Sequence, residues 1–184
     1  MESALDRAEE AVTEGRERVL NLRAFQASTN ELADAFPLLA GQALQGSTAD
    51  LKVVVEGNAR PLHPWVREEV YSIGREAIVN AFRHAEGTHI EVEITYDSRE
   101  LRLRIRDDGR GMDPEILSAG GKPGHWGLKG MRERAKNIGA DLQIWSGPGT
   151  GTEVDLRVPA IRAYPTEVAG ARWVWLRGVL GRNR

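Results

Sequence analysis

Polar and apolar residues alternate along two neighbouring segments in the middle of the chain. Residues 89–96 read His-Ile-Glu-Val-Glu-Ile-Thr-Tyr, and residues 100–106 read Glu-Leu-Arg-Leu-Arg-Ile-Arg. A repeat of two residues places successive side chains on opposite faces of a β-strand, so each segment has one buried and one solvated face. The short connection through Asp97 and Ser98 predicts that the two strands form an antiparallel hairpin.

A second hairpin is predicted further along the chain. Residues 142–145 and 152–158 have strand-like patterns on either side of the glycine-rich turn at residues 147–151. A separate short strand is predicted at residues 51–57, an apolar run that ends at a glycine.

Apolar residues recur at helical spacing in residues 64–85. Another helix is predicted at residues 127–139, where a glycine ends it. A further helix is predicted after Ser28, which forms a capping box with Glu31, and Pro37 should kink or split this helix. Helices and hairpins in this order predict an α+β fold, a two-layer sandwich of helices on one face of a mostly antiparallel mixed sheet.

An N-terminal helix is predicted to precede this fold. Residues 1–26 contain a heptad seam, with members alternately four and three residues apart: Met1, Leu5, Ala8, Val12, Gly15, Val19 and Leu22. Half of a helical dimerisation bundle and an amphipathic helix packed on its own domain both fit this pattern. The bundle is favoured because the helix precedes the domain and Gly15 permits close contact between helices.

The last segment, residues 161–184, is basic and contains tryptophan. It has five arginines against one glutamate, and Trp173 and Trp175 belong to an apolar set. A membrane-surface or partner-binding segment and an element folded back on the domain both fit this composition. The sequence therefore predicts three parts, which are the helix 1–26, a central domain 27–160 and the tail 161–184.

The composition is that of a soluble globular protein and excludes several kinds of chemistry. Of the 184 residues 41% are hydrophobic and 28% are charged, and the net charge of −2 gives no electrostatic case for nucleic acid binding. The absence of cysteine excludes disulfides and thiolate metal sites and suits a reducing cytoplasm. No apolar run approaches the ~20 residues of a membrane span, and no signal peptide is visible.

Four polar residues of the helix 64–85 are expected to share one α-helical face because of their spacing. They are Glu76, Asn80, Arg83 and His84. A carboxylate and an amide oxygen are hard ligands of the kind that Mg²⁺ prefers, and a cation one turn further on can meet phosphate oxygens. A solvated face of a surface helix is the alternative, but the apolar neighbours of these residues favour the border of a cleft.

Three glycine-rich segments complete the candidate chemistry. Residues 107–112 end a strand, where a carboxylate can accept a hydrogen bond from the amine of adenine and glycines let the backbone approach a ligand. Residues 124–129 open a helix, whose free N–H groups suit phosphate. Residues 149–152 form either a plain hairpin turn or an edge that contacts a ligand. Each segment alone is common, but all four motifs in this order predict a site for a nucleoside triphosphate with magnesium.

The order of these motifs resembles the ATPase superfamily of gyrase, heat-shock chaperones, histidine kinases and mismatch-repair proteins. Within it, residues 75–85 and 127–135 are similar to bacterial sensor histidine kinases of the nitrate-sensor and desaturase-sensor type. Residues 1–24 resemble the second helix of that family's dimerisation and phosphoacceptor domain. The resemblance implies the histidine kinase-like ATPase fold, with ATP and Mg²⁺ as cofactors.

The resemblance also implies a role for each motif residue. Asn80 would coordinate Mg²⁺, and Glu76 would bind the metal or its water and help to position the transferring phosphoryl group. Asp107 would bind the adenine amine, and residues 112–126 would form the nucleotide lid. The other nucleotide-binding positions would be Arg83, His84, Gly109, Gly111, Met112, Gly124, Gly127, Leu128, Lys129 and Thr152.

One departure from the family pattern concerns the phosphoacceptor, a histidine followed by an acidic residue. None of the four histidines, at positions 63, 84, 89 and 125, is followed by such a residue. The chain is therefore expected to be a fragment of a longer kinase, unable to phosphorylate itself alone. The longer kinase would be a homodimer that passes the phosphoryl group to a response regulator. It would be cytoplasmic, reaching a membrane only through other segments.

Two other functions are compatible with the motifs. The domain could bind nucleotide and regulate a partner without transfer, or it could be a serine kinase of the anti-sigma type. Intact Glu76 and Asn80 favour the histidine kinase over the first alternative, and the helix at residues 1–24 favours it over the second.

Overall fold

The computed structural model of the protein describes residues 31–43, 49–113 and 127–165. Three sequence-based expectations lie outside these residues. They are the N-terminal helix 1–26, the lid beyond residue 113 with Gly124, and the tail beyond residue 165.

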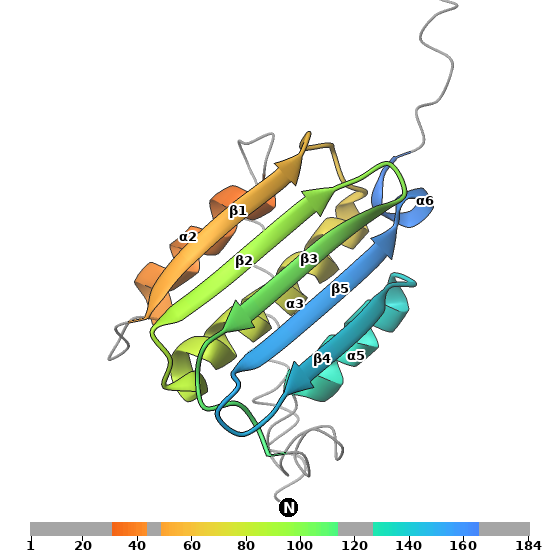
Figure 1. The fold of residues 1–184 in the computed structure, drawn as a ribbon. Coiled ribbons are helices and arrows are strands. Elements are labelled where there is room, and N and C mark those ends of the chain that lie inside the picture. The colour runs from red at the N-terminus through yellow and green to blue at the C-terminus, as the bar shows by residue number, and fades with distance from the viewer. Residues whose placement is uncertain (1–30, 44–48, 114–126, 166–184) are drawn as a thin grey trace, which may run out of the picture.

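Five strands form one mixed sheet in the described part of the chain. They are β1 (Asp50–Gly57), β2 (His89–Tyr96), β3 (Glu100–Asp107), β4 (Asp141–Ser146) and β5 (Thr152–Pro159). Their order across the sheet is β1-β2-β3-β5-β4, in which β1 and β2 are parallel and all other neighbours are antiparallel (Figure 1). Both predicted hairpins are confirmed, as β2–β3 and β4–β5.

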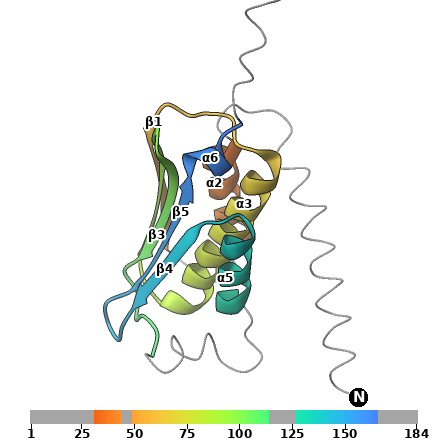
Figure 2. The same ribbon diagram turned by 90° about the vertical axis from the view of Figure 1, so that its right-hand side faces the viewer.

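The described helices cover one face of this sheet and leave its other face uncovered by helices (Figure 2). They are α2 (Glu31–Ala43), α3 (Pro64–Asn80), the short π-helix η1 (Ala81–Ala85), α5 (Gly127–Asn137) and α6 (Ala160–Ala163). α2 continues through Pro37 as one helix, so it is not split there. The predicted two-layer α+β sandwich is confirmed.

The apolar residues of the alternating strands point inward and form the core between the sheet and the helices. In β2 and β3 these residues are Ile90, Val92, Ile94, Leu101, Leu103 and Ile105, all nearly inaccessible to solvent. On the helical side, the Phe36 ring of α2 stacks on Tyr71 of α3 with their centroids 5.8 Å apart. A Cβ at Gly74 would contact the Phe36 ring, so the glycine permits this close approach of α2 to α3.

The outward positions of the sheet are joined by ion pairs across strands. Asp155 of β5 is only 1% exposed and accepts hydrogen bonds from Arg102 at 2.7 Å and Arg157 at 2.9 Å. Burial alone would raise the pKa of Asp155, but its hydrogen bonds to the two arginines outweigh that effect and lower the pKa. Charged side chains therefore stabilise the face of the sheet opposite the described helices.

The fold continues beyond the predicted domain boundary at residue 160. Ala163 and Tyr164 are buried, and the Arg60 guanidinium lies 3.9 Å from the centroid of the Tyr164 ring. The Tyr164 hydroxyl donates a hydrogen bond to the carbonyl of Glu100 at 3.1 Å. Among the described residues, no helix combines the length and the apolar character that crossing a membrane requires.

Candidate functional site

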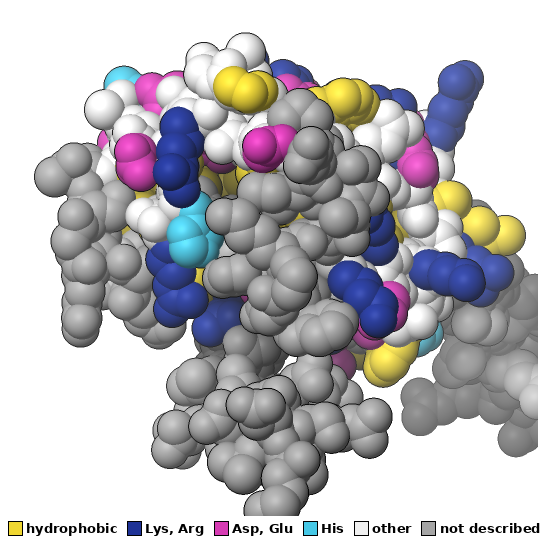
Figure 3. Space-filling view, turned by 90° about the horizontal axis from the view of Figure 1, so that it is seen from below, with side chains coloured by type: hydrophobic (Ala, Val, Ile, Leu, Met, Phe, Trp, Pro, Cys, Tyr) yellow, Lys and Arg dark blue, Asp and Glu magenta, His cyan; other side chains and the backbone are white. Residues whose placement is uncertain are grey.

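The predicted site motifs gather at one end of the sandwich. β3 ends there beside the β4–β5 turn, while α3 ends and α5 begins on the helical side (Figures 1 and 2). Viewed from below, this end of the molecule carries prominent basic side chains (Figure 3). The exposed basic residues of the motif segments are Arg83, His84, Arg110 and Lys129.

Glu76 and Asn80 lie one turn apart on α3 and contact each other. The Asn80 amide donates through Nδ2 to Glu76 Oε1 at 3.0 Å, and both side chains are partly buried. Gly127, the first residue of α5, lies directly against this pair. A Cβ at position 127 would collide with Glu76 Oε1 and would lie 3.5 Å from Asn80 Nδ2. The helix motif and the predicted helix start therefore meet at this point.

Beyond Asn80 the helix changes from α to π geometry. η1 covers residues 81–85, and Glu86 ends it with a φ of +56° in the left-handed region. A π-turn is wider than an α-turn, so it shifts the following side chains around the helix axis. The spacing argument assumed an uninterrupted α-helix, so it does not by itself place Arg83 and His84 on the face of Glu76 and Asn80. The side chains of Arg83 and His84 are exposed at this end of the domain.

Asp107, at the end of β3, is buried although it is a carboxylate, with 7% of its surface exposed. Its Oδ1 accepts hydrogen bonds from the backbone N–H of Gly109 at 2.9 Å and of Thr152 at 3.2 Å. Burial raises the pKa of this carboxyl, and the hydrogen bonds from Gly109 and Thr152 offset that effect only in part. Backbone donors thus fix the orientation of the acceptor that the sequence assigns to the adenine amine.

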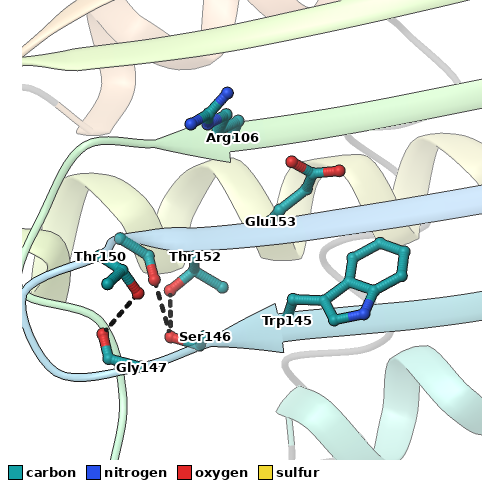
Figure 4. Close-up of a pocket in the computed structure, with 8 residues that line it drawn as sticks. Arg106, Trp145, Ser146, Gly147, Thr150, Thr152 and Glu153 are labelled. Carbon is teal, nitrogen blue, oxygen red and sulfur yellow. Dashed lines mark hydrogen bonds between the residues drawn. The ribbon is translucent and has the colours of Figure 1, made fainter.

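Ser146, the last residue of β4, is absent from the site residues predicted from the sequence. Its hydroxyl accepts a hydrogen bond from Met112 N–H at 2.8 Å and donates one to the Gly151 carbonyl at 3.0 Å. It also lies 2.9 Å from the Thr152 hydroxyl (Figure 4). The alternation in β4 could have identified it, because Ser146 follows Leu142 and Ile144 on the inward side of the strand. A polar side chain in such a position needs a hydrogen-bond partner.

Glycines let the backbone segments of this cluster meet. A Cβ at Gly151, whose φ is +74°, would collide with the Asp107 carbonyl oxygen, and one at Gly111, whose φ is +68°, would collide with the Gly147 carbonyl oxygen. Left-handed φ values disfavour other residues there as well. A Cβ at Gly109 would likewise collide with the carbonyl oxygen of Ala85. Glycine is therefore required at these positions for packing within the protein, whatever ligand is bound.

Asp108 contrasts with the neighbouring Asp107. It is exposed, and its Oδ1 accepts hydrogen bonds from the backbone N–H of Thr88 at 2.7 Å and of His89 at 2.9 Å. The Thr88 hydroxyl donates to Oδ2 at 2.8 Å. The bonds from His89 and Thr88 lower the pKa of Asp108 well below its usual range. Asp108 therefore ties the end of β3 to the start of β2.

The start of α5 contains two more of the predicted positions. Leu128 is buried and packs in the core, whereas the exposed Lys129 lies 3.8 Å from Glu133. Further along α5, Arg134 Nη1 lies 3.2 Å from the carboxylate of the buried Glu69 of α3. This ion pair holds α5 against α3 and so fixes the place of the helix start.

A pocket of about 290 Å³ lies at the β4–β5 hairpin (Figure 4). It is lined by Arg106, Trp145, Ser146, Gly147, Thr150, Gly151, Thr152 and Glu153. It shares Ser146, Gly151 and Thr152 with the hydrogen-bonded cluster around Asp107 but includes neither Glu76 nor Asn80. The hydrogen-bond geometry, rather than this pocket, therefore defines the candidate site.

The donor set suits magnesium held jointly by protein and phosphate. Glu76 offers a carboxylate, and the hydrogen bond between the two residues engages Asn80 Nδ2 rather than the amide oxygen. Among residues 31–43, 49–113 and 127–165, no three His, Cys, Asp or Glu side chains group together as a metal site. Mg²⁺ keeps several waters and needs only one or two protein ligands when substrate phosphates supply the others, so these residues fit it.

Comparisons with known proteins show which family the chain resembles. The model of the family described as "Histidine kinase-, DNA gyrase B-, and HSP90-like ATPase" matches residues 66–162. The chain is 37% identical over 111 residues to sensor protein VraS of Staphylococcus aureus (strain COL). The matched residues cover 59% of this chain and 30% of VraS. It is 37% identical over 99 residues to VraS of Staphylococcus haemolyticus (strain JCSC1435), covering 53% of this chain and 27% of that protein. The chain thus spans about 30% of the length of these curated relatives.

Two solved structures share the fold. The histidine kinase domain of the Erythrobacter litoralis EL346 blue-light activated histidine kinase superposes with a TM-score of 0.61 at 21% identity, covering 85% of this chain and 84% of that chain. A second structure of that kinase gives a TM-score of 0.56 at 25% identity, covering 70% of this chain and 41% of that one.

The family match covers more than half of the chain, and the protein therefore belongs to the histidine kinase-, DNA gyrase B- and HSP90-like ATPase family. The expected ATP-binding domain is confirmed at the level of this family.

Proposed function

We propose that this domain binds ATP with Mg²⁺ and transfers its terminal phosphoryl group to a histidine that lies outside the predicted domain 27–160. The observation that carries the proposal is the meeting of Glu76, Asn80 and Gly127 at the same end of the domain as the buried Asp107. Oxygen ligands for a cation and an acceptor for a base amine are thereby offered from two sides of one site.

Asp107 recognises the base in this proposal. Two backbone N–H groups orient its carboxylate, which accepts a hydrogen bond from the exocyclic amine of adenine. Guanine presents a carbonyl oxygen at the corresponding position, and a carboxylate repels it. Gly109, Gly111, Met112 and Thr152 shape the surrounding pocket.

Glu76 and Asn80 act at the phosphates. Asn80 binds Mg²⁺ through its amide oxygen, while Glu76 binds the metal or its water and helps to position the transferring group. The ion supplies neutralisation of the charge that develops on the phosphoryl oxygens. Further contacts to the phosphates come from Arg83, His84, Lys129, Gly124, Gly127 and Leu128.

The partners follow from the sensor kinase relatives. The acceptor histidine belongs to a helix preceding residues 1–26, and those residues are the second helix of a dimerisation bundle of the nitrate-sensor and desaturase-sensor type. The longer kinase is a cytoplasmic homodimer, reaches a membrane only through other segments, and passes the phosphoryl group to an aspartate of a response regulator.

Calorimetric titration of the 184-residue chain tests the binding step. ATP is expected to bind, more tightly with Mg²⁺ than with a chelator, and GTP at least about tenfold more weakly, because one charge-assisted hydrogen bond becomes a repulsion. Equal affinity for ATP and GTP contradicts the role of Asp107, and no ATP binding contradicts the whole proposal.

A longer chain that includes the preceding helix tests the transfer step. Incubation with ATP labelled in the γ-position should give a phosphoprotein whose label is lost in acid and kept in base, as expected of phosphohistidine. Acid-stable label on serine would instead support a kinase of the anti-sigma type. Nucleotide binding without label would support a regulatory module.

A further inference from the structure

A continuous chain of hydrogen bonds runs from the segment after β3 to the Asp107 carboxylate. The Met112 N–H donates to Ser146 Oγ at 2.8 Å, and the Ser146 hydroxyl donates to the Gly151 carbonyl at 3.0 Å. The next peptide N–H, that of Thr152, donates to Asp107 Oδ1 at 3.2 Å. Each step is within ordinary hydrogen-bond distance.

The centre of this chain is a single peptide group. The Gly151 carbonyl and the Thr152 N–H belong to the same planar amide, and they point in opposite directions in a trans peptide. Ser146 therefore binds one end of the amide while Asp107 binds the other. Hydrogen bonds in series polarise one another, so a donor at the carbonyl strengthens the N–H as a donor.

The backbone at this amide tolerates little change. Gly151 has a φ of +74°, and a Cβ there would collide with the carbonyl oxygen of Asp107. The Thr152 hydroxyl, 2.9 Å from Ser146 Oγ, adds a second contact between the two strands of the hairpin (Figure 4). The serine hydroxyl on β4 thus contacts two other segments of the chain, at residue 112 and at residues 151–152.

We propose that Ser146 is a positioning residue for base recognition, which orients the Gly151–Thr152 amide and through it the Asp107 carboxylate. The inference rests on the proposed binding of adenine by Asp107. In this inference Ser146 does not touch the nucleotide. Its loss lowers the preference of the site for a base with the exocyclic amine over a base without it.

The test compares ATP with purine riboside triphosphate, which has the same ring and phosphates but lacks the exocyclic amine. In Ser146→Ala the affinity for ATP should fall about three- to tenfold, the range expected for one misplaced hydrogen bond. The affinity for purine riboside triphosphate should change less than twofold, because that nucleotide does not use the Asp107 contact. Ser146→Thr retains the hydroxyl and should restore the preference for ATP.

Thr150→Ala is the matched control. Thr150 lies in the same turn, and its hydroxyl donates to the Gly147 carbonyl at 3.0 Å without joining the chain to Asp107. Removing this hydroxyl should leave the ratio of the two affinities unchanged. If Ser146→Ala melts below the assay temperature, Ser146→Cys, with its weaker donor, provides the comparison and should give an intermediate ratio.

The outcomes separate this inference from the proposed function. Equal losses for both nucleotides, or no loss for either, would overturn the positioning role while leaving ATP binding intact. A wild-type protein that binds neither nucleotide would overturn the proposed function itself. A selective loss for ATP that Ser146→Thr restores supports the positioning role.

Discussion

Asp107 and the Glu76–Asn80 pair lie at the same end of the domain but are held in different ways. Asp107 is 7% exposed, ends a central strand and receives two backbone N–H bonds. Glu76 and Asn80 belong to a helix and are joined by one hydrogen bond between their side chains. A single such bond contributes only about 1 kcal/mol, so an incoming cation can replace it.

The difference indicates a division of roles. The carboxylate proposed to recognise the base is oriented by the backbone before a ligand arrives, whereas the proposed metal ligands can exchange their mutual contact for a cation. Changes at Asp107 should therefore act on nucleotide affinity, and changes at Asn80 should act mainly on phosphoryl transfer.

The largest effect is expected for Asn80→Ala. Loss of the amide ligand should lower Mg²⁺-dependent phosphoryl transfer, measured in a longer chain with the acceptor helix, on the order of 100-fold or more, since bound metal supplies several kcal/mol of charge stabilisation. ATP affinity measured with a chelator should change little. Asn58→Ala, in the exposed connection between β1 and α3, is the control and should transfer at the normal rate. Normal transfer by Asn80→Ala would contradict the metal role.

Asp107→Asn should lower ATP affinity by about 10- to 100-fold, because a hydrogen bond to a charged acceptor is worth about 1.5–3 kcal/mol. Thermal stability should not fall, since burial raises the pKa of the Asp107 carboxyl and the ionised group therefore costs stability at neutral pH. Calorimetry and thermal melting of the same samples measure both quantities. A lower melting temperature with unchanged ATP affinity would assign Asp107 to folding alone.

Two glycines of α5 test the contact between the helix start and the proposed metal ligands Glu76 and Asn80. Gly127→Ala places a methyl group against the Glu76 carboxylate and should cost about 1–3 kcal/mol of stability together with Mg²⁺-dependent ATP affinity. Gly130→Ala, where a Cβ meets nothing within 4 Å, should instead stabilise the helix by about 0.5–1 kcal/mol and leave binding unchanged. If both substitutions change the free energy of unfolding equally in chemical denaturation, helix propensity explains both effects and the contact with Glu76 does not contribute.

Local patterns suffice to predict most of the secondary structure. The alternation of polar and apolar residues in residues 89–106 predicts that one face of each strand is buried. This prediction needs only the residues of the strand itself. The parallel pairing of β1 with β2 and the position of β5 between β3 and β4 depend on contacts between distant segments. No periodicity encodes these contacts, so strand order is found only in the structure.

The same limit applies to the site. The contact between Glu76 and Asn80 follows from their spacing of four on a helix. The π-turn after Asn80, the approach of Gly127 to Glu76 and the contacts of Ser146 depend on tertiary packing. Sequence reasoning therefore identifies residues within one element more readily than residues that join elements.

The smallest effect concerns the two adjacent carboxylates, whose pKa values shift in opposite directions. The pKa of Asp108 is lowered by its hydrogen bonds to His89 and Thr88, so its contribution to stability is present above the ordinary value of 3.8 and is lost as the pH falls toward the lowered pKa. Asp108→Asn should therefore reduce the acid-side loss of melting temperature between about pH 4 and pH 2.

The pKa of Asp107 is raised chiefly by burial, so its favourable contribution is present below the ordinary value of 3.8 and is lost as the pH rises through the raised pKa. In melting curves recorded from pH 2 to pH 7, the wild-type protein should lose stability relative to Asp107→Asn as the pH rises, and relative to Asp108→Asn as it falls. Parallel curves for both variants would mean that the neighbouring carboxylates do not differ in environment, which would remove the basis for assigning base recognition to Asp107 and an anchoring role to Asp108.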